Sequence, residues 1–141
     1  MGYNIIVQAG GKGTRLEGLT KNKPKCLVPY DNLPLIFHLF KKFPKAKFTI
    51  IADYKVEVLQ KYLDIFAQDY DWRILLANGI GTVSGLGEAV KGFSEDESFM
   101  VIWCDLILSR EFSLPCGLSQ SKHNVLNSTK QSTKSAKLAP P

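Results

Sequence analysis

The stretch Ala9-Gly10-Gly11-Lys12-Gly13-Thr14-Arg15-Leu16 (AGGKGTRL, residues 9–16) decides the interpretation of this sequence, and it directly follows the apolar run 4–8 (NIIVQ). A short apolar run before glycines predicts a buried strand followed by a turn. Glycines let backbone N–H groups approach phosphate oxygens, and an arginine adds a forked donor that suits a phosphate. The stretch therefore predicts a phosphate-binding loop at the end of a buried strand.

Two common phosphate motifs do not fit this loop. The dinucleotide fingerprint GxGxxG needs a glycine at position 16, where the chain has Leu16. The Walker A motif needs Ser or Thr after Gly-Lys, but Gly13 follows Gly11 and Lys12. A typical NAD-binding fold and a P-loop ATPase are therefore excluded, and a plain glycine turn with solvated cations stays the alternative for the loop alone.

Apolar periodicity divides the first 110 residues into alternating strands and helices. Strands are predicted at 4–8, 47–52, 73–77 and 99–104, and helices from about 32–34 to 43, at 56–66 and at 84–91. Pro34 is expected in the first turn of the first helix, Pro44 is expected to stop it, and Asp53 is expected to cap the second. This alternation predicts an α/β fold, a Rossmann-like and mostly parallel sheet with helices on both faces.

Polar segments follow three of the predicted strands. The glycine loop follows the first strand, the segment 78–82 (NGIGT) follows the third, and Asp105 follows the fourth. Ligands of parallel sheets bind beyond the carboxyl ends of the strands, so these segments are expected at one edge. A second basic stretch, 22–29 (NKPKCLVP), carries Lys25 between two prolines that stiffen the loop, and a lysine there can reach a second phosphate.

The composition indicates one globular domain followed by a polar C-terminal segment. The chain has 141 residues, is 45% hydrophobic and carries a net charge of +5. Residues 1–116 are predicted to form the α/β domain, and 117–141 a polar, basic, disordered tail. The tail holds four lysines and no acid, so the domain without it has a charge of +1, and no nucleic-acid partner is expected.

The sequence also indicates a cellular compartment and the state of the cysteines. No apolar run approaches the roughly 18 residues of a membrane span, and no secretory signal is visible, so a cytoplasmic protein without a membrane partner is expected. The three cysteines are widely spaced and make neither a disulfide framework nor a CxxC metal clip. They are expected to be buried or idle thiols.

The motifs AGGKGTRL and NKPKCLVP, followed by a helix beginning NLPLIFHLF, resemble the N-terminal half of the sugar-nucleotidyltransferase (NTP-transferase) family. The resemblance covers residues 3 to about 115 and looks closest to capsule or cell-surface branches that act on phosphocholine-like or phosphoglutamine-like acceptors. It implies a Mg²⁺-dependent enzyme that joins an NTP (CTP, UTP or GTP) to a small phosphorylated acceptor, such as a sugar 1-phosphate, and releases pyrophosphate.

The resemblance also implies a role for each residue that matches the family motifs. Ala9, Gly10, Gly11, Gly13 and Thr14 would wrap the nucleotide phosphates, and Gly81 and Thr82 would contact the base and ribose. Arg15 would hold the departing phosphates, and Lys25 would neutralise the α-phosphate and the attacking phosphate. Asp105 would bind Mg²⁺, although Cys104 stands where the family usually has glycine.

The family implies a second half that this sequence lacks. Family members continue with further strands, an acceptor pocket and a second acidic metal ligand, whereas Glu111 is the last acidic residue here. We therefore expect a truncated nucleotidyltransferase whose own activity is open, with a nucleotide-binding module without turnover as the alternative. A nucleic-acid binder acting through the tail ranks last. A sheet that ends at the fourth strand has an open edge, which allows a homodimer.

Overall fold

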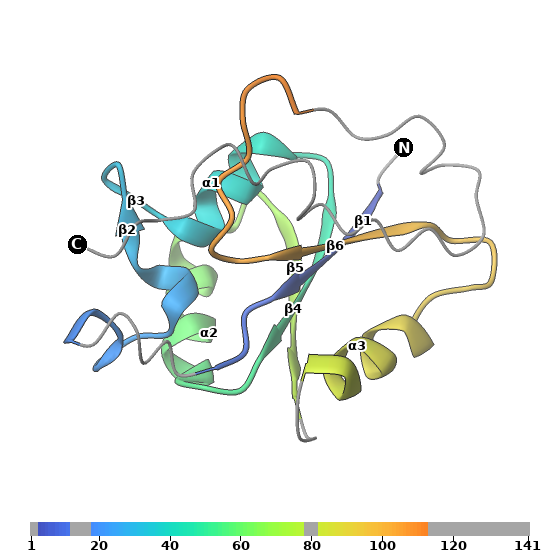
Figure 1. Ribbon diagram of the computed structural model, residues 1–141, viewed down its shortest axis with the longest axis horizontal. Helices are drawn as coiled ribbons and strands as arrows, with labels where there is room; N and C mark the ends of the chain where they lie inside the picture. The colour runs from blue at the N-terminus through green and yellow to red at the C-terminus, as the bar shows by residue number, and fades with distance from the viewer. Residues whose placement is uncertain (1–2, 12–17, 78–81, 113–141) are drawn as a thin grey trace.

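The computed structural model of the chain describes residues 3–11, 18–77 and 82–112, without the side chains of 82–84 (Figure 1). In chain order, the elements are β1 (Asn4–Gln8), η2 (Lys25–Leu27), β2 (Pro29–Tyr30), β3 (Leu33–Pro34), α1 (Leu35–Lys42), β4 (Lys47–Ala52), α2 (Val56–Phe66), β5 (Asp71–Leu76), α3 (Thr82–Lys91) and β6 (Phe99–Trp103). The tail predicted at 117–141 lies outside the described residues.

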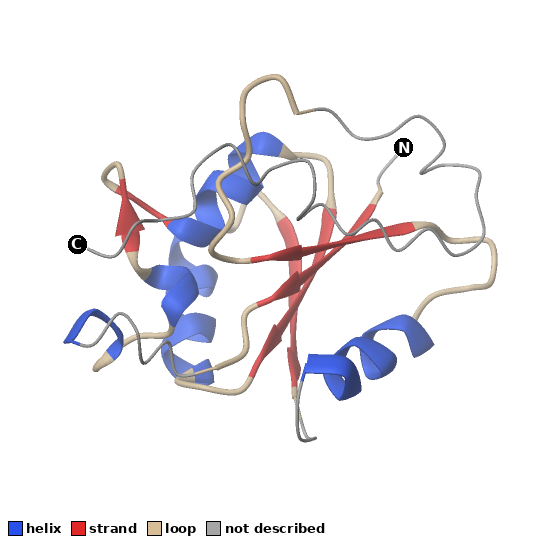
Figure 2. Ribbon diagram, viewed as in Figure 1, coloured by secondary structure: helices blue, strands red, loops and turns tan. Residues whose placement is uncertain are grey.

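The main sheet is parallel throughout, and the first strand of the chain lies inside it. Its order is β5-β4-β1-β6. Gln8, at the end of β1, is opposite Ile51 of β4 on one side and Trp103 of β6 on the other. The predicted Rossmann-like α/β arrangement is therefore confirmed, and the carboxyl ends of all four strands meet at one edge (Figure 2).

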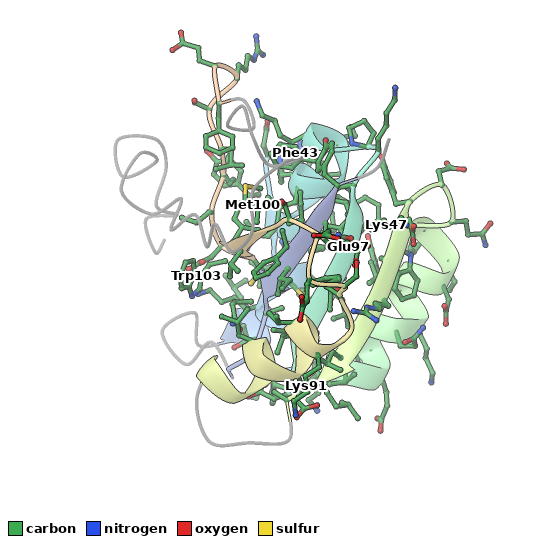
Figure 3. The ribbon with its side chains drawn as sticks, turned by 90° about the vertical axis from the view of Figure 1, so that its right-hand side faces the viewer. Phe43, Lys47, Lys91, Glu97, Met100 and Trp103 are labelled. Atoms are coloured by element: carbon green, nitrogen blue, oxygen red, sulfur yellow. The ribbon has the colours of Figure 1, made fainter. Side chains whose placement is uncertain are left out.

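Helices cover both faces of this sheet, as predicted. Alternate residues of β1 enter two cores, Ile5 and Val7 on one face and Ile6 on the other. The larger core lies under α1 and α2 and includes Phe43 and Met100, both labelled in Figure 3. The smaller core lies under α3, the one described helix on that face. A central strand buried on both faces explains why residues 4–8 form a nearly continuous apolar run.

A small hairpin precedes α1 and moves its start. The predicted helix contained Pro34 in its first turn. In the structure Pro34 pairs with Pro29 in the β2–β3 hairpin and is the N-cap residue that precedes α1. The two turn residues, Asp31 and Asn32, have φ of 49° and 61°. Asp and Asn accept positive φ more readily than most residues, and a two-residue hairpin turn requires it. Helix α1 therefore begins at Leu35, and it ends at Lys42, before Pro44.

The other boundaries differ from the prediction by a few residues at most. Strand β4 and helix α2 have the predicted limits, β5 is 71–76 rather than 73–77, and α3 begins at Thr82 rather than Ser84. Strand β6 ends at Trp103, yet the Cys104 N–H still donates to the Gln8 carbonyl (3.1 Å), which continues the ladder by one bond. No helix in the described part of the chain is long and apolar enough to cross a membrane.

Helix α3 packs unusually close to the sheet through a glycine. A Cβ atom built on Gly85 would lie 2.6 Å from Ile51 Cγ2 and 3.7 Å from the Ala77 Cβ. Any side chain at this position would therefore push the helix away from β4. The close approach brings the first turn of α3 toward the carboxyl end of β4, where the polar segments gather.

Candidate functional site

Three polar groups follow three adjacent strands at the carboxyl edge. Gly10 and Gly11 follow β1 in the middle, Asp53 follows β4 on one side, and Asp105 follows β6 on the other. The Ala9 N–H donates to the Ile51 carbonyl (2.9 Å), so the loop leaves the sheet still attached to β4. The start of the glycine loop thus lies between two carboxylates.

Lys25 is held in place by its buried neighbours. It is the first residue of the 3-10 turn η2, in which Leu27 N–H donates to the Pro24 carbonyl (3.0 Å). Cys26 and Leu27 are buried in the larger core, while Lys25 stays partly exposed. Burial of the flanking residues fixes the backbone here, so the Lys25 ammonium is positioned by the fold.

Lys25 and Asp105 form an ion pair across the carboxyl edge. The Lys25 Nζ is 2.7 Å from Asp105 Oδ2, although the residues are 80 positions apart in the sequence. The two side chains are 29% and 33% exposed. Both charged groups therefore remain accessible to a ligand, and their partial burial makes each of them a stronger electrostatic partner than a fully hydrated charge.

Asp53 has a different partner from the one the sequence suggested. The prediction that it caps α2 is wrong, because Lys55, with φ of 51°, is the N-cap residue. The Asp53 carboxylate instead accepts a hydrogen bond from the Gly11 N–H, with an N to Oδ1 distance of 2.6 Å. Gly11 has φ of +96°, a conformation open to glycine, and this turns its N–H toward β4.

Two buried thiols lie directly behind the ion pair. Cys26 follows Lys25, Cys104 precedes Asp105, and both cysteines belong to the larger core. Burial raises the pKa of Cys26 well above its usual value, and burial together with the charge of Asp105 raises the pKa of Cys104 to about 12. Both thiols are therefore protonated at neutral pH and pack as small apolar groups, as expected for buried cysteines.

The structure describes part of the predicted site. Ala9, Gly10 and Gly11 lie at the end of β1, and Lys25 and Asp105 are brought together. Gly13, Thr14, Arg15 and Gly81 lie outside the described residues, and of Thr82 only the backbone at the start of α3 is described. Within the described ranges, no group of three or more His, Cys, Asp or Glu side chains could hold a metal ion.

This arrangement suits a ligand that carries phosphates and a divalent cation. A single carboxylate such as Asp105 fits Mg²⁺, because this ion commonly takes one or two protein carboxylates and fills its shell with water and substrate phosphates. The neighbouring ammonium of Lys25 supplies a point charge for a phosphate oxygen. The charges of Lys25 and Asp105 therefore suit phosphate chemistry.

Asp53 is the site residue that the sequence did not reveal as one. Its position directly after a predicted strand was visible, and the same position made Asp105 a candidate. What the local pattern could not show is that β4 is the neighbour of β1, which places Asp53 against the glycine loop. The adjacent Tyr54 also reaches the loop region, since its hydroxyl donates to the Thr20 carbonyl (3.0 Å).

Comparisons with known proteins agree with this geometry. Mannose-1-phosphate guanyltransferase of Aspergillus fumigatus is 32% identical over 114 residues, which cover 76% of this chain and 31% of that protein. The bifunctional protein GlmU of Methanocaldococcus jannaschii is 34% identical over 109 residues, 74% of this chain and 25% of that protein. The structure of CTP:phosphocholine cytidylyltransferase (LicC) from Streptococcus pneumoniae superposes with a TM-score of 0.63 at 25% identity, over 79% of this chain and 49% of that one.

The match covers the N-terminal part of a longer domain. The chain spans about a quarter to a third of the length of the curated relatives it matches and about half of the solved structures, as expected from the resemblance to the family's N-terminal half. The family model for the MobA-like NTP transferase domain matches residues 5–114, a range that contains the glycine loop, Lys25 and Asp105. The chain therefore belongs to the MobA-like NTP transferase family, whose members include the sugar nucleotidyltransferases.

Proposed function

We propose that this chain provides the NTP-binding half of a nucleotidyltransferase that joins an NTP to a small phosphorylated acceptor and releases pyrophosphate. The observation that carries the proposal is the Lys25–Asp105 pair, 2.7 Å apart beside the glycine loop. A nucleoside triphosphate with Mg²⁺ matches both charges, because its phosphate oxygens suit the Lys25 ammonium and its cation suits the Asp105 carboxylate. The names of the relatives, which act on mannose 1-phosphate or phosphocholine, support an acceptor that is a phosphate monoester.

The proposed roles follow the position of each group. The loop backbone at Gly10, Gly11 and Gly13 would surround the nucleotide phosphates, with the Gly11 N–H held by Asp53. Arg15 would bind the departing pyrophosphate, and Lys25 the α-phosphate and the attacking phosphate oxygen. Asp105 would hold Mg²⁺, which supplies charge neutralisation at the phosphates when bound. Such a reaction depends on positioning and charge stabilisation rather than on a covalent enzyme intermediate.

The base, the acceptor and the setting belong to the same proposal. Gly81 and Thr82 would contact the base and ribose of CTP, UTP or GTP. We place the reaction in the synthesis of surface polysaccharides, in the cytoplasm. The outer edge of β6 is one of the two ends of the described sheet and would serve a homodimer or the second half of a longer domain.

A pyrophosphate-release assay tests this function. The chain is incubated with CTP, UTP or GTP, Mg²⁺ and each of several acceptors (mannose 1-phosphate, glucose 1-phosphate, phosphocholine), and pyrophosphate is measured. We expect release with one pairing and none when Mg²⁺ is replaced by EDTA. An absence of release from every pairing would contradict turnover by this chain.

The second candidate function is nucleotide binding without turnover. It is favoured by one observation, the coverage of about half of each related structure. Calorimetric titration with each NTP and Mg²⁺ separates the two functions. Binding without pyrophosphate release supports the second candidate, and binding with release supports the first.

A further inference from the structure

The junction between β4 and α2 holds both described ends of the glycine loop. The Ile51 carbonyl accepts the Ala9 N–H at 2.9 Å, and the Asp53 carboxylate accepts the Gly11 N–H at 2.6 Å. After the loop, the Thr20 carbonyl accepts the Tyr54 hydroxyl at 3.0 Å. Three residues of this junction, Ile51, Asp53 and Tyr54, therefore contact the chain on both sides of the segment that the motif assigns to phosphates.

Asp53 makes the closest of these contacts. A Cβ atom built on Gly10 would lie 3.6 Å from Asp53 Cγ, Oδ1 and Oδ2 alike, so the face of the carboxylate borders the space that a Gly10 side chain would take, while it accepts from Gly11. The contact joins residues 42 positions apart. A charge-assisted bond to a backbone N–H is among the stronger hydrogen bonds in proteins, so it fixes the direction of the first turn of the loop.

We propose that Asp53 is a positioning residue for nucleotide binding: its carboxylate holds Gly11 at positive φ and so fixes the main chain where the phosphate motif begins. This inference rests on the proposed function, and it adds to it a residue that the family motifs do not include. The Asp53 carboxylate accepts from the Gly11 N–H, so the inference assigns it no direct contact with the phosphates. It acts through the main chain of Gly11.

The charge and the hydrogen bond of Asp53 can be separated by substitution. Asp53→Asn keeps an oxygen that can accept the Gly11 N–H and removes the negative charge. Asp53→Ala removes both. Asp69→Ala is the matched control, because Asp69 is an exposed carboxylate that follows the other end of α2, and its loss changes the net charge equally.

Two measurements on the full chain test the proposal. In the nucleotide-free protein, hydrogen exchange of the Gly11 amide is followed by NMR, and we expect faster exchange in Asp53→Ala than in Asp53→Asn or Asp69→Ala. The dissociation constant of the NTP with Mg²⁺ is then measured by calorimetry. We expect Asp53→Ala to weaken binding roughly 2- to 10-fold, the range of one lost hydrogen bond. Asp53→Asn should restore the affinity. The melting temperature of each variant is measured as well, so that a loss of binding is distinguished from a loss of stability.

Each other outcome has a definite meaning. Equal affinity in Asp53→Ala and the unaltered chain overturns the inference and leaves the proposed function intact. Tighter binding by Asp53→Ala also overturns it, because the carboxylate would then compete with phosphate for the Gly11 N–H. Failure of the unaltered chain to bind any NTP overturns the proposed function, and the inference with it.

Discussion

The two carboxylates beside the glycine loop have different kinds of partner. Asp105, on the β6 side, pairs with a side-chain ammonium, and each of these side chains is about one-third exposed. Asp53, on the β4 side, pairs with a backbone N–H. Side chains can change partners when a ligand arrives, whereas a bond to the main chain sets the path of the loop. The β6 side therefore suits contact with a ligand, and the β4 side suits shaping of the loop.

The largest expected effect on pyrophosphate release comes from substitution of Asp105. Asp105→Asn removes the charge that would hold Mg²⁺, and pyrophosphate release should fall on the order of 10²–10³-fold. Asp53→Asn keeps its acceptor oxygen, and release should change less than about 3-fold. The assay is pyrophosphate release at saturating NTP. Equal losses in the two variants would contradict the distinction between the two sides.

The support under the β4 side can be tested by paired substitutions in α3. Gly85→Ala places a methyl group 2.6 Å from Ile51 Cγ2, and we expect a loss of about 1–3 kcal/mol in the free energy of unfolding. Gly87→Ala introduces the same methyl group where nothing lies within 4 Å. At this exposed helix position it should raise the free energy of unfolding by up to about 1 kcal/mol, because alanine favours a helix more than glycine does. Urea denaturation measures both, and a common sign of the two changes would disprove the close packing.

The glycine between the two carboxylates gives a smaller effect. Gly11→Ala should cost roughly 1–2 kcal/mol of stability because a side chain at φ of +96° is strained although the surrounding space is open. Gly87→Ala is the control, since its surroundings are equally open and it lies within helix α3, where φ is not positive. Thermal unfolding of the two variants should separate them, and equal midpoints would show that Gly11 is not held in this conformation.

The smallest effect on stability is expected at the ion pair itself. Lys25→Met keeps most of the apolar stem, and the free energy of unfolding should change by less than about 1 kcal/mol, because a pair this exposed is worth little. Pyrophosphate release by the same variant should fall strongly if Lys25 serves the phosphates. A large loss of stability with unchanged release would mean that the pair is structural.

The sequence predicted the individual strands and helices better than it predicted which of them lie side by side. The apolar runs 4–8, 47–52 and 99–104 specified strands within one residue, because strands buried on both faces are nearly continuous in apolar side chains. The common edge of Asp105 and the glycine loop followed from a parallel sheet. The pairing of Lys25 with Asp105 did not, since it depends on where η2 packs. The role of Asp53 depends on strand order, which no local pattern contains.

Turn chemistry was the other source of error. Asp31 and Asn32 tolerate positive φ, and together they form a hairpin that takes Leu33 and Pro34 out of the expected helix. A proline before an apolar run fits a helix start equally well in the first turn or just before it. The pairing of Pro29 with Pro34, a contact between the two hairpin strands, decides between these positions.

The central place of β1 has a consequence for how the protein is made. Of the four strands in the described sheet, β1 is synthesised first and needs a partner on each side, β4 and β6, and β6 is synthesised last. Pairing across such long sequence separations is slow and closes late in folding. The glycine loop can therefore form early against β4, whereas Lys25 must wait for Asp105. A nascent chain that stops before residue 99 would carry the anchored loop but neither edge strand β6 nor the carboxylate that completes the ion pair.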